Sequence, residues 1–220
     1  MNVWNAQAWL FDMDGVLADN CRYHVLAWQA FTARYGTHLT EEQVLGWMGA
    51  TNQVYMERLF GRPVSGEELT ALENEKESLY REIFAPHLKM PPGLRDLLDA
   101  AHAKNIRCAV ATGAPQQNVD FVLDGLGIRD DFVCVVDPSQ YANSKPAPDC
   151  YLRAASNLDA PPSGCIVFED AVNGIAAGHA AGMRVVAIAT TNPRAVLESA
   201  GADLVIDSFQ NLNAVNIFPQ

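Results

Sequence analysis

Two aspartates near the N-terminus, Asp12 and Asp14, have the residue type and spacing for cation and proton chemistry. The apolar run 8–11 before them predicts a short buried strand. Alternate residues of an extended segment point the same way, so both carboxylates can face one pocket. Such a pair can hold a hard cation, or one carboxylate can attack an electrophile while the other carries a proton. The alternative is an Asp-Gly turn, formed with Gly15, that closes the strand.

Two further segments place polar groups where they could hold a phosphate. Thr112 and Gly113 follow the apolar run 106–111 and lead into a predicted helix, so a hydroxyl and a flexible backbone can hydrogen-bond a phosphoryl oxygen. Lys145 is followed by prolines at 146 and 148, which stiffen its surroundings, and its ammonium can neutralise a bound phosphate. The alternative is a helix N-cap for Thr112 and a solvated loop lysine for Lys145.

A second acidic pair, Glu169 and Asp170, follows the apolar run 165–168. Capping the next helix would need only one carboxylate, so the pair also fits a cation site. Four predicted strand ends therefore bear, in chain order, two carboxylates, a hydroxyl, an ammonium and two more carboxylates. We interpret this set as one site for phosphoryl-group chemistry.

The elements that must position these groups are apolar strands alternating with helices. Nearly continuous apolar strands separated by helices predict an α/β fold, with a parallel sheet covered on both faces. In such folds ligands bind beyond the carboxyl ends of the strands, where the polar groups are predicted to lie. The predicted strands are 8–11, 106–112, 132–136, 165–168, 184–189 and 203–206.

Residues 18–88 interrupt this alternation, because they show helical signals and no strand. We expect a core domain formed by 1–17 and 89–220, into which 18–88 is inserted as a four-helix cap domain. Thr40 is expected to open the second cap helix with a capping box, and Asn52 to cap the third.

The composition narrows the possible partners and location of the protein. With 49% hydrophobic and 19% charged residues, the 220-residue chain has the composition of an ordinary globular protein. Its formal net charge of −11, with no run of Lys and Arg, argues against nucleic acid or an anionic membrane as partner. No apolar run approaches the ~18–20 residues of a membrane span, and the N-terminus lacks a signal-peptide pattern. We therefore expect a cytoplasmic protein, and a monomer.

The motifs together resemble those of the haloacid dehalogenase-like superfamily of phosphotransferases. Residues 11–17, Phe-Asp-Met-Asp-Gly-Val-Leu, look like its first motif and Thr112 like its second. Lys145-Pro146 is similar to the third, and 168–170 with 173–178 to the fourth. The resemblance covers essentially the whole chain. It implies a Rossmann-like three-layer core, a mobile cap and dependence on Mg²⁺.

The resemblance also implies a role for each site residue. Asp12 would attack phosphorus and become an aspartyl-phosphate, while Asp14 would protonate the leaving oxygen and then deprotonate the incoming one. Magnesium would be held by Asp12, the backbone carbonyl of Asp14, Asp170 and water, with Glu169 in or just beyond that set. The residues that would hold phosphoryl oxygens are Thr112 and Lys145.

Within the superfamily the chain is most similar to the β-phosphoglucomutase-like branch. The similarity rests on residues 19–24, Ala27-Trp28, Lys76 and Tyr80. It implies that His24 gates and positions the general acid, and that Lys76 contacts that acid or the substrate. The alternative places His24 on a helix surface and makes Lys76 one cation of an exposed Glu-Lys-Glu run.

The chain departs from the mutase pattern in two places. It has Asn20 where that motif has threonine, and 49–52, ending in Asn52, where mutases carry an arginine that clamps the non-transferring phosphate. Arg58 or Arg62 could compensate. We therefore favour hydrolysis of a small sugar phosphate, or a similar phosphorylated metabolite, over interconversion of β-glucose 1-phosphate and glucose 6-phosphate. A remote alternative is a non-catalytic phosphate-binding switch.

Overall fold

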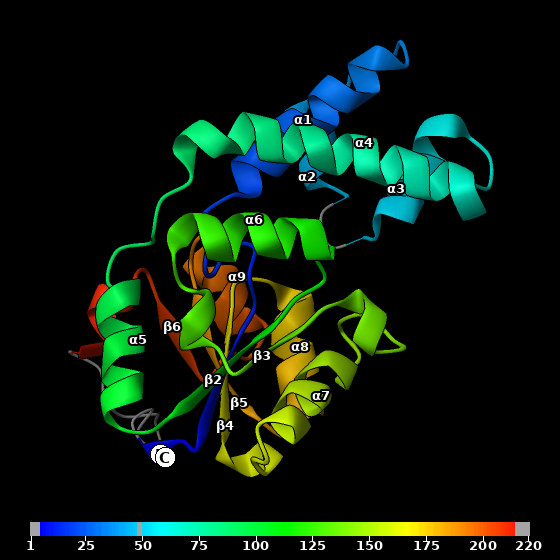
Figure 1. Ribbon diagram of the computed structural model, residues 1–220. Coiled ribbons are helices and arrows are strands. Elements are labelled where there is room, and N and C mark those ends of the chain that lie inside the picture. The colour runs from blue at the N-terminus through cyan, green and yellow to red at the C-terminus, as the bar shows by residue number, and fades with distance from the viewer. Residues whose placement is uncertain (1–4, 48–49, 214–220) are drawn as a thin grey trace. The chain divides into compact units, whose positions relative to one another are not determined.

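The computed structural model describes residues 5–47 and 50–213, and its contacts divide the chain into two compact units. The first, called the core unit, comprises Met1–Asp19 and Lys89–Gln220. The second, called the helical unit, comprises Asn20–Leu88 (Figure 1). Residues 1–4 and 214–220 of the predicted core domain, and residues 48–49 of the predicted cap, lie outside the described residues.

The core unit is built on a parallel sheet, whose order among the described residues is β3-β2-β1-β4-β5-β6. The strand order turns back at β1, so β1 lies between β2 and β4, and the carboxyl ends of these strands meet at a switch point. The predicted α/β class with a parallel sheet is confirmed. The strands are β1 (Ala8–Phe11), β2 (Arg107–Ala111), β3 (Cys134–Val136), β4 (Cys165–Glu169), β5 (Arg184–Ile188) and β6 (Leu204–Ile206).

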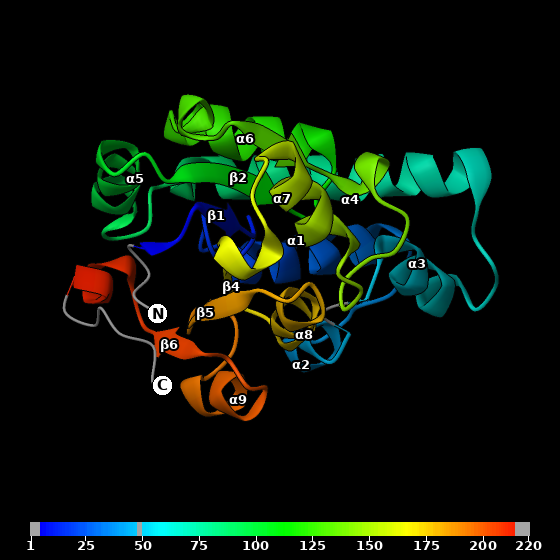
Figure 2. The ribbon, with the colours of Figure 1, turned by 90° about the horizontal axis from the view of Figure 1, so that it is seen from below.

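Helices cover both faces of this sheet. In Figure 2, α7 and α8 lie on one side of the sheet, where they pack on β1 to β5, and α5 lies on the other, against β2. The loops after β3 and β4 lead into α7 and α8, and together with the segments after β1 and β2 they carry the polar groups of interest. The core helices are α5 (Leu94–Ala103), α6 (Gln116–Leu126), α7 (Asp149–Asn157), α8 (Val172–Ala180) and α9 (Arg194–Ser199).

Strand β1 is buried on both faces, as its continuous apolar sequence predicts. Ala8 and Leu10 join the aliphatic cluster that includes residues of α7 and α8. Trp9 and Phe11 point to the opposite face, where the Phe11 ring stacks on Phe168 of β4 with centroids 4.5 Å apart. This packing holds the end of β1 rigidly beside the end of β4.

The helical unit contains α1 (Cys21–Arg34), α2 (Glu41–Leu45), α3 (Asn52–Phe60) and α4 (Gly66–Phe84). Thr40 and Gln43 form the predicted capping box of α2. The prediction that Asn52 caps α3 is wrong, because Thr51 holds the N-cap position with an extended backbone. Asn52 is the first helical residue, and its side chain donates to Glu77 of α4 instead. None of the described helices has the length and apolarity that a membrane span requires.

Candidate active site

The carboxyl end of β1 brings Asp12 beside Lys145, which comes from the loop after β3. Lys145 Nζ donates to Asp12 Oδ1 at 2.6 Å, to Glu169 Oε1 at 2.7 Å and to the carbonyl oxygen of Ala111 at 3.2 Å. These acceptors match the three hydrogens of an ammonium group. Because only 15% of the Lys145 side chain is exposed, Lys145 is not a solvated loop lysine. Burial lowers its pKa, but Asp12 and Glu169 raise it well above its usual value, so the ammonium stays charged.

Glu169 is the last residue of β4, and both of its carboxylate oxygens accept hydrogen bonds. Oε1 accepts from Lys145 and, at 2.7 Å, from the hydroxyl of Tyr151, while Oε2 accepts from the backbone N–H groups of Asp170 and Ala171 at 2.9 and 3.1 Å. A carboxylate has about four acceptor positions, so these hydrogen bonds occupy all the positions that Glu169 offers. Burial raises the pKa of Glu169, but Lys145 outweighs that effect and the pKa lies below its usual value. In this arrangement Glu169 orients Lys145.

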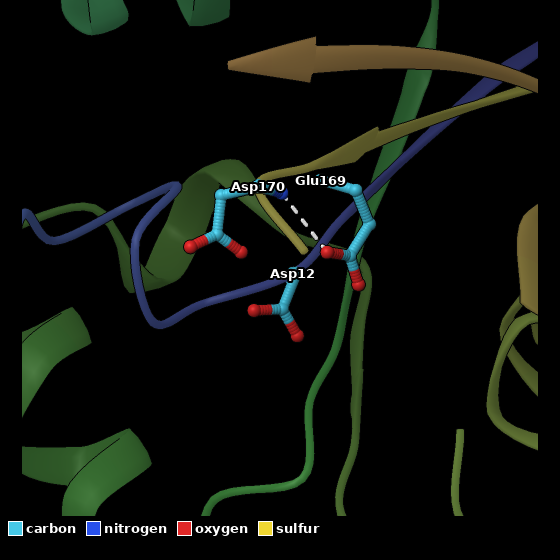
Figure 3. Close-up of side chains that lie close together, drawn as sticks. All are labelled: Asp12, Glu169 and Asp170. Carbon is cyan, nitrogen blue, oxygen red and sulfur yellow. Dashed lines mark hydrogen bonds between the residues drawn. The ribbon is translucent and has the colours of Figure 1, made fainter. Parts of the chain in front are cut away.

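The carboxylates of Asp12, Glu169 and Asp170 gather at the ends of β1 and β4 (Figure 3). One oxygen of each lies within 4.8 Å of the others, and all three residues are buried. Burial, followed by the neighbouring carboxylates, raises the pKa of Asp170. Burial also raises the pKa of Asp12 to about 7, against the lowering effect of Lys145. The group holds more negative than positive charge, which a hard divalent cation would offset, so these residues fit Mg²⁺.

Two glycines make room for this carboxylate cluster. A Cβ atom on Gly174 would collide with the Glu169 carboxylate, and one on Gly15 would collide with Asp170. Gly15 also has a φ of 76°, in the left-handed region that favours glycine. Leu17 and Ala18 donate backbone hydrogen bonds to the carbonyl of Met13. The Asp-Gly turn and the carboxylate cluster are therefore both present, and the turn packs against the cluster.

Thr112, Gly113 and Asp14 lie at the same edge of the sheet, at the ends of β2 and β1. Thr112 is buried, and its Oγ1 accepts from the N–H of Ala114 at 3.0 Å. It is not the N-cap of α6, a position that Pro115 holds. A hydroxyl that accepts this bond can still donate to a phosphoryl oxygen. Asp14 is partly exposed, and its charge contributes to the raised pKa of Asp12. Its carboxylate is outside the group that could share a cation.

Sequence reasoning missed two contributors to this site. Tyr151 of α7 is fully buried, donates to Glu169, and presents its ring to Lys145 Nζ at 4.7 Å from the centroid. Its place on an apolar helix face predicts only core packing. The second contributor is the loop 190–192 after β5, which bonds to Gly15 and Asp170. Extending the strand-end argument to β5 could have found this loop.

In the helical unit, Lys76 and Glu77 are buried, so neither residue belongs to an exposed charged run. Lys76 Nζ lies 2.9 Å from Glu77 Oε1 and 3.0 Å from His24 Nδ1. The same Glu77 oxygen accepts from Asn52 Nδ2 at 2.9 Å. The four residues form one polar cluster, in which Glu77 offsets the charge of Lys76.

The two arginines considered as substitutes for a phosphate clamp have partners of their own. Arg62 donates to both carboxylate oxygens of Glu68 on the exposed surface. The Arg58 guanidinium lies 5.4 Å from the centroid of the Trp47 ring. The helical unit therefore gives no support to compensation by either arginine.

Comparison with known proteins identifies the family. A model of the haloacid dehalogenase-like hydrolases matches residues 6–182. β-Phosphoglucomutase of Bacillus subtilis is 31% identical over 213 residues, which cover 94% of this chain and 91% of that protein. A phosphorylated carbohydrates phosphatase of Thermotoga maritima is 31% identical over 217 residues, which cover 95% and 98%.

A solved structure and a longer relative extend the comparison. The crystal structure of a haloacid dehalogenase-like hydrolase from Entamoeba histolytica has a TM-score of 0.87 and 30% identity, covering 96% of both chains. The chain is also 32% identical to Protein SUPPRESSOR OF QUENCHING 1 of Arabidopsis thaliana, of which it spans only 20%. The chain belongs to the haloacid dehalogenase-like hydrolase family. Within that family it falls in the β-phosphoglucomutase-like branch and is an enzyme, a phosphatase or a phosphomutase.

Proposed function

We propose that the enzyme catalyses Mg²⁺-dependent phosphoryl transfer through an aspartyl-phosphate on Asp12. The overall reaction is hydrolysis of a small sugar phosphate or similar phosphate monoester. The observation that carries the proposal is the buried group in which Lys145 bridges Asp12 and Glu169, with the Asp170 carboxylate close by. The relatives named phosphorylated carbohydrates phosphatase and β-phosphoglucomutase support a small phosphorylated substrate.

Each residue has a separate task in this reaction. Asp12 attacks phosphorus, so that a new P–O bond forms while the bond to the ester oxygen breaks, and Asp14 gives its proton to that oxygen. Asp14 then takes a proton from the water that attacks the aspartyl-phosphate, which releases phosphate and restores Asp12. Lys145 fixes one oxygen of Asp12 and, with Thr112, offsets charge on the phosphoryl oxygens.

Asp12, Asp170 and the backbone carbonyl of Asp14 are the groups proposed to hold Mg²⁺, with Glu169 just beyond them. When bound, the cation supplies positive charge that offsets the phosphoryl oxygens. The hydrogen bonds that Glu169 already accepts favour its place outside the ligand set. Its task is then to keep Lys145 and Asp170 in position.

The rate should depend on pH through Asp12, because a carboxylate attacks phosphorus only when it is ionised. Burial raises the pKa of Asp12 to about 7, so we expect kcat/KM at limiting Mg²⁺ to rise as the pH rises through about 7. A bound cation favours the ionised form, so saturating Mg²⁺ should move this rise to lower pH. Rate profiles at limiting and saturating Mg²⁺ measure both effects. A rise that stays at the same pH would contradict this role of Asp12.

The helical unit is proposed to be the cap that selects the substrate, with His24, Lys76 and Asn52 as its selecting residues. Asn52 is uncharged and Glu77 offsets Lys76, so this cluster offers no net positive charge to a second phosphate. A phosphomutase must hold a bisphosphate intermediate, so the charge balance favours hydrolysis. The mutase reaction remains the second candidate, because a relative carries that name.

One assay separates the two reactions. The purified enzyme is given Mg²⁺, β-glucose 1-phosphate and a catalytic amount of glucose 1,6-bisphosphate, and both products are followed with time. We expect inorganic phosphate to form faster than glucose 6-phosphate. Faster formation of glucose 6-phosphate would overturn hydrolysis as the main reaction. A panel of other phosphorylated sugars then identifies the preferred monoester.

A further inference from the structure

The loop between β5 and α9 brings three consecutive polar side chains to the site. Thr190 Oγ1 donates to the carbonyl oxygen of Gly15 at 2.5 Å. The Thr191 hydroxyl lies beside the Asp170 carboxylate, and Asn192 Nδ2 donates to the carbonyl oxygen of Asp170 at 3.0 Å. The loop therefore contacts both the turn after β1 and the acidic end of β4.

Thr191 lies where these two segments meet. A Cβ atom on Gly15 would lie 2.7 Å from Thr191 Oγ1 and would collide with the Asp170 carboxylate. The absence of a side chain at Gly15 thus allows the hydroxyl and the carboxylate to occupy neighbouring positions. Thr191 is half-buried, which limits competition from water for a hydrogen bond between its hydroxyl and the neighbouring carboxylate.

A hydroxyl in this position has a specific effect on a metal-binding carboxylate. A free Asp side chain rotates about its bonds, and that freedom is lost when a cation binds. A hydrogen bond to the carboxylate restricts the rotation beforehand, and partners of this kind beyond the ligands are known to set metal affinity. Asn192 adds a second restraint, because it holds the backbone of the same residue.

We propose that Thr191 is a positioning residue that fixes the Asp170 carboxylate for a divalent cation, while Thr190 and Asn192 anchor its loop to Gly15 and Asp170. The proposal rests on the proposed function in one respect, that Asp170 is a cation ligand. It adds a fifth strand end, that of β5, to the four identified in the sequence.

The test is Mg²⁺ binding to the full chain, measured by titration calorimetry in the absence of substrate. Thr191→Val keeps the shape of the side chain and removes the hydroxyl. It should raise the Kd for Mg²⁺ by about 10- to 100-fold. Thr191→Ser keeps the hydroxyl and should restore tight binding. Thr70→Val makes the same change on an exposed helix position, where the hydroxyl bonds only to the carbonyl of Gly66 among the contacts described, and should bind Mg²⁺ as the wild type does.

Asp170→Asn separates failure of this proposal from failure of the proposed function. If Asp170→Asn loses Mg²⁺ binding while Thr191→Val binds as tightly as the wild type, the role of Thr191 is overturned and the metal site stands. If Asp170→Asn itself binds Mg²⁺ normally, the metal site and the role of Thr191 both fall. Should Thr191→Val not fold, Thr191→Ala takes its place in the same comparison with Thr191→Ser.

Discussion

Asp12→Asn should reduce phosphate ester hydrolysis by on the order of 10⁴- to 10⁶-fold, the loss that follows removal of a catalytic nucleophile. An amide has nearly the shape of the carboxylate but cannot form the aspartyl-phosphate. The variant should nevertheless fold. Burial already disfavours the ionised form of Asp12, as its raised pKa shows. A neutral side chain therefore relieves part of the electrostatic repulsion among the carboxylates. Turnover of p-nitrophenyl phosphate with Mg²⁺, together with thermal unfolding, measures both effects.

The matched control for Asp12→Asn is Asp130→Asn, which makes the same change at an exposed position away from the cluster. Its turnover should equal that of the wild type. Hydrolysis by a folded Asp12→Asn variant at a rate comparable to the wild type would contradict the role of Asp12 as nucleophile.

Lys145→Met should impair both catalysis and stability. The ammonium offsets the buried charges of Asp12 and Glu169, and removing one partner of a buried ion pair typically costs about 3–5 kcal/mol of unfolding free energy. Loss of a charge that stabilises the transition state should lower kcat by about 10²- to 10³-fold. The stability deficit should be smallest in acid, where both carboxyl groups are protonated. It should grow as Glu169 ionises, below the usual pKa of a glutamate, and grow again as the pH rises through about 7, where Asp12 ionises.

Urea unfolding of Lys145→Met, with and without Mg²⁺, measures the stability effect. Added Mg²⁺ should recover part of the lost stability, because the cation offsets the same carboxylates. Lys104→Met, at an exposed position on the end of α5, serves as control and should change the unfolding free energy by less than about 0.5 kcal/mol. A Lys145→Met variant as stable as Lys104→Met would show that Lys145 does not offset the buried charges.

The fold and the core of the site could be predicted because both follow from short-range patterns. Apolar runs such as 8–11 and 165–168 identify the strands, and a parallel sheet gathers their carboxyl ends at one edge. That rule places Asp12 near Asp170 without knowledge of a single contact. It also places Lys145 there, although 133 residues separate it from Asp12.

The remaining features depend on packing that the local sequence does not specify. Lys76 lies in a Glu-Lys-Glu run that is typical of an exposed helix, but α4 packs against α1 and buries it beside His24. Tyr151 is a core residue by pattern, and only the tertiary structure brings its hydroxyl to Glu169. Asn52 has the side chain of an N-cap, yet the carboxylate of Glu77 is its partner. In each case a polar side chain has a partner that is distant in the sequence.

The most direct test of the central claim is the chemical identity of the phosphorylated enzyme. The enzyme is mixed with Mg²⁺ and a phosphate ester that it hydrolyses, and the reaction is quenched rapidly in acid during turnover. The protein is then digested, and its peptides are analysed by mass spectrometry. We predict that one phosphoryl group is found on the peptide of residues around Asp12, attached to Asp12 itself and absent from the Asp12→Asn variant. Phosphate on another residue, or turnover without any phosphorylated Asp12, would contradict the account.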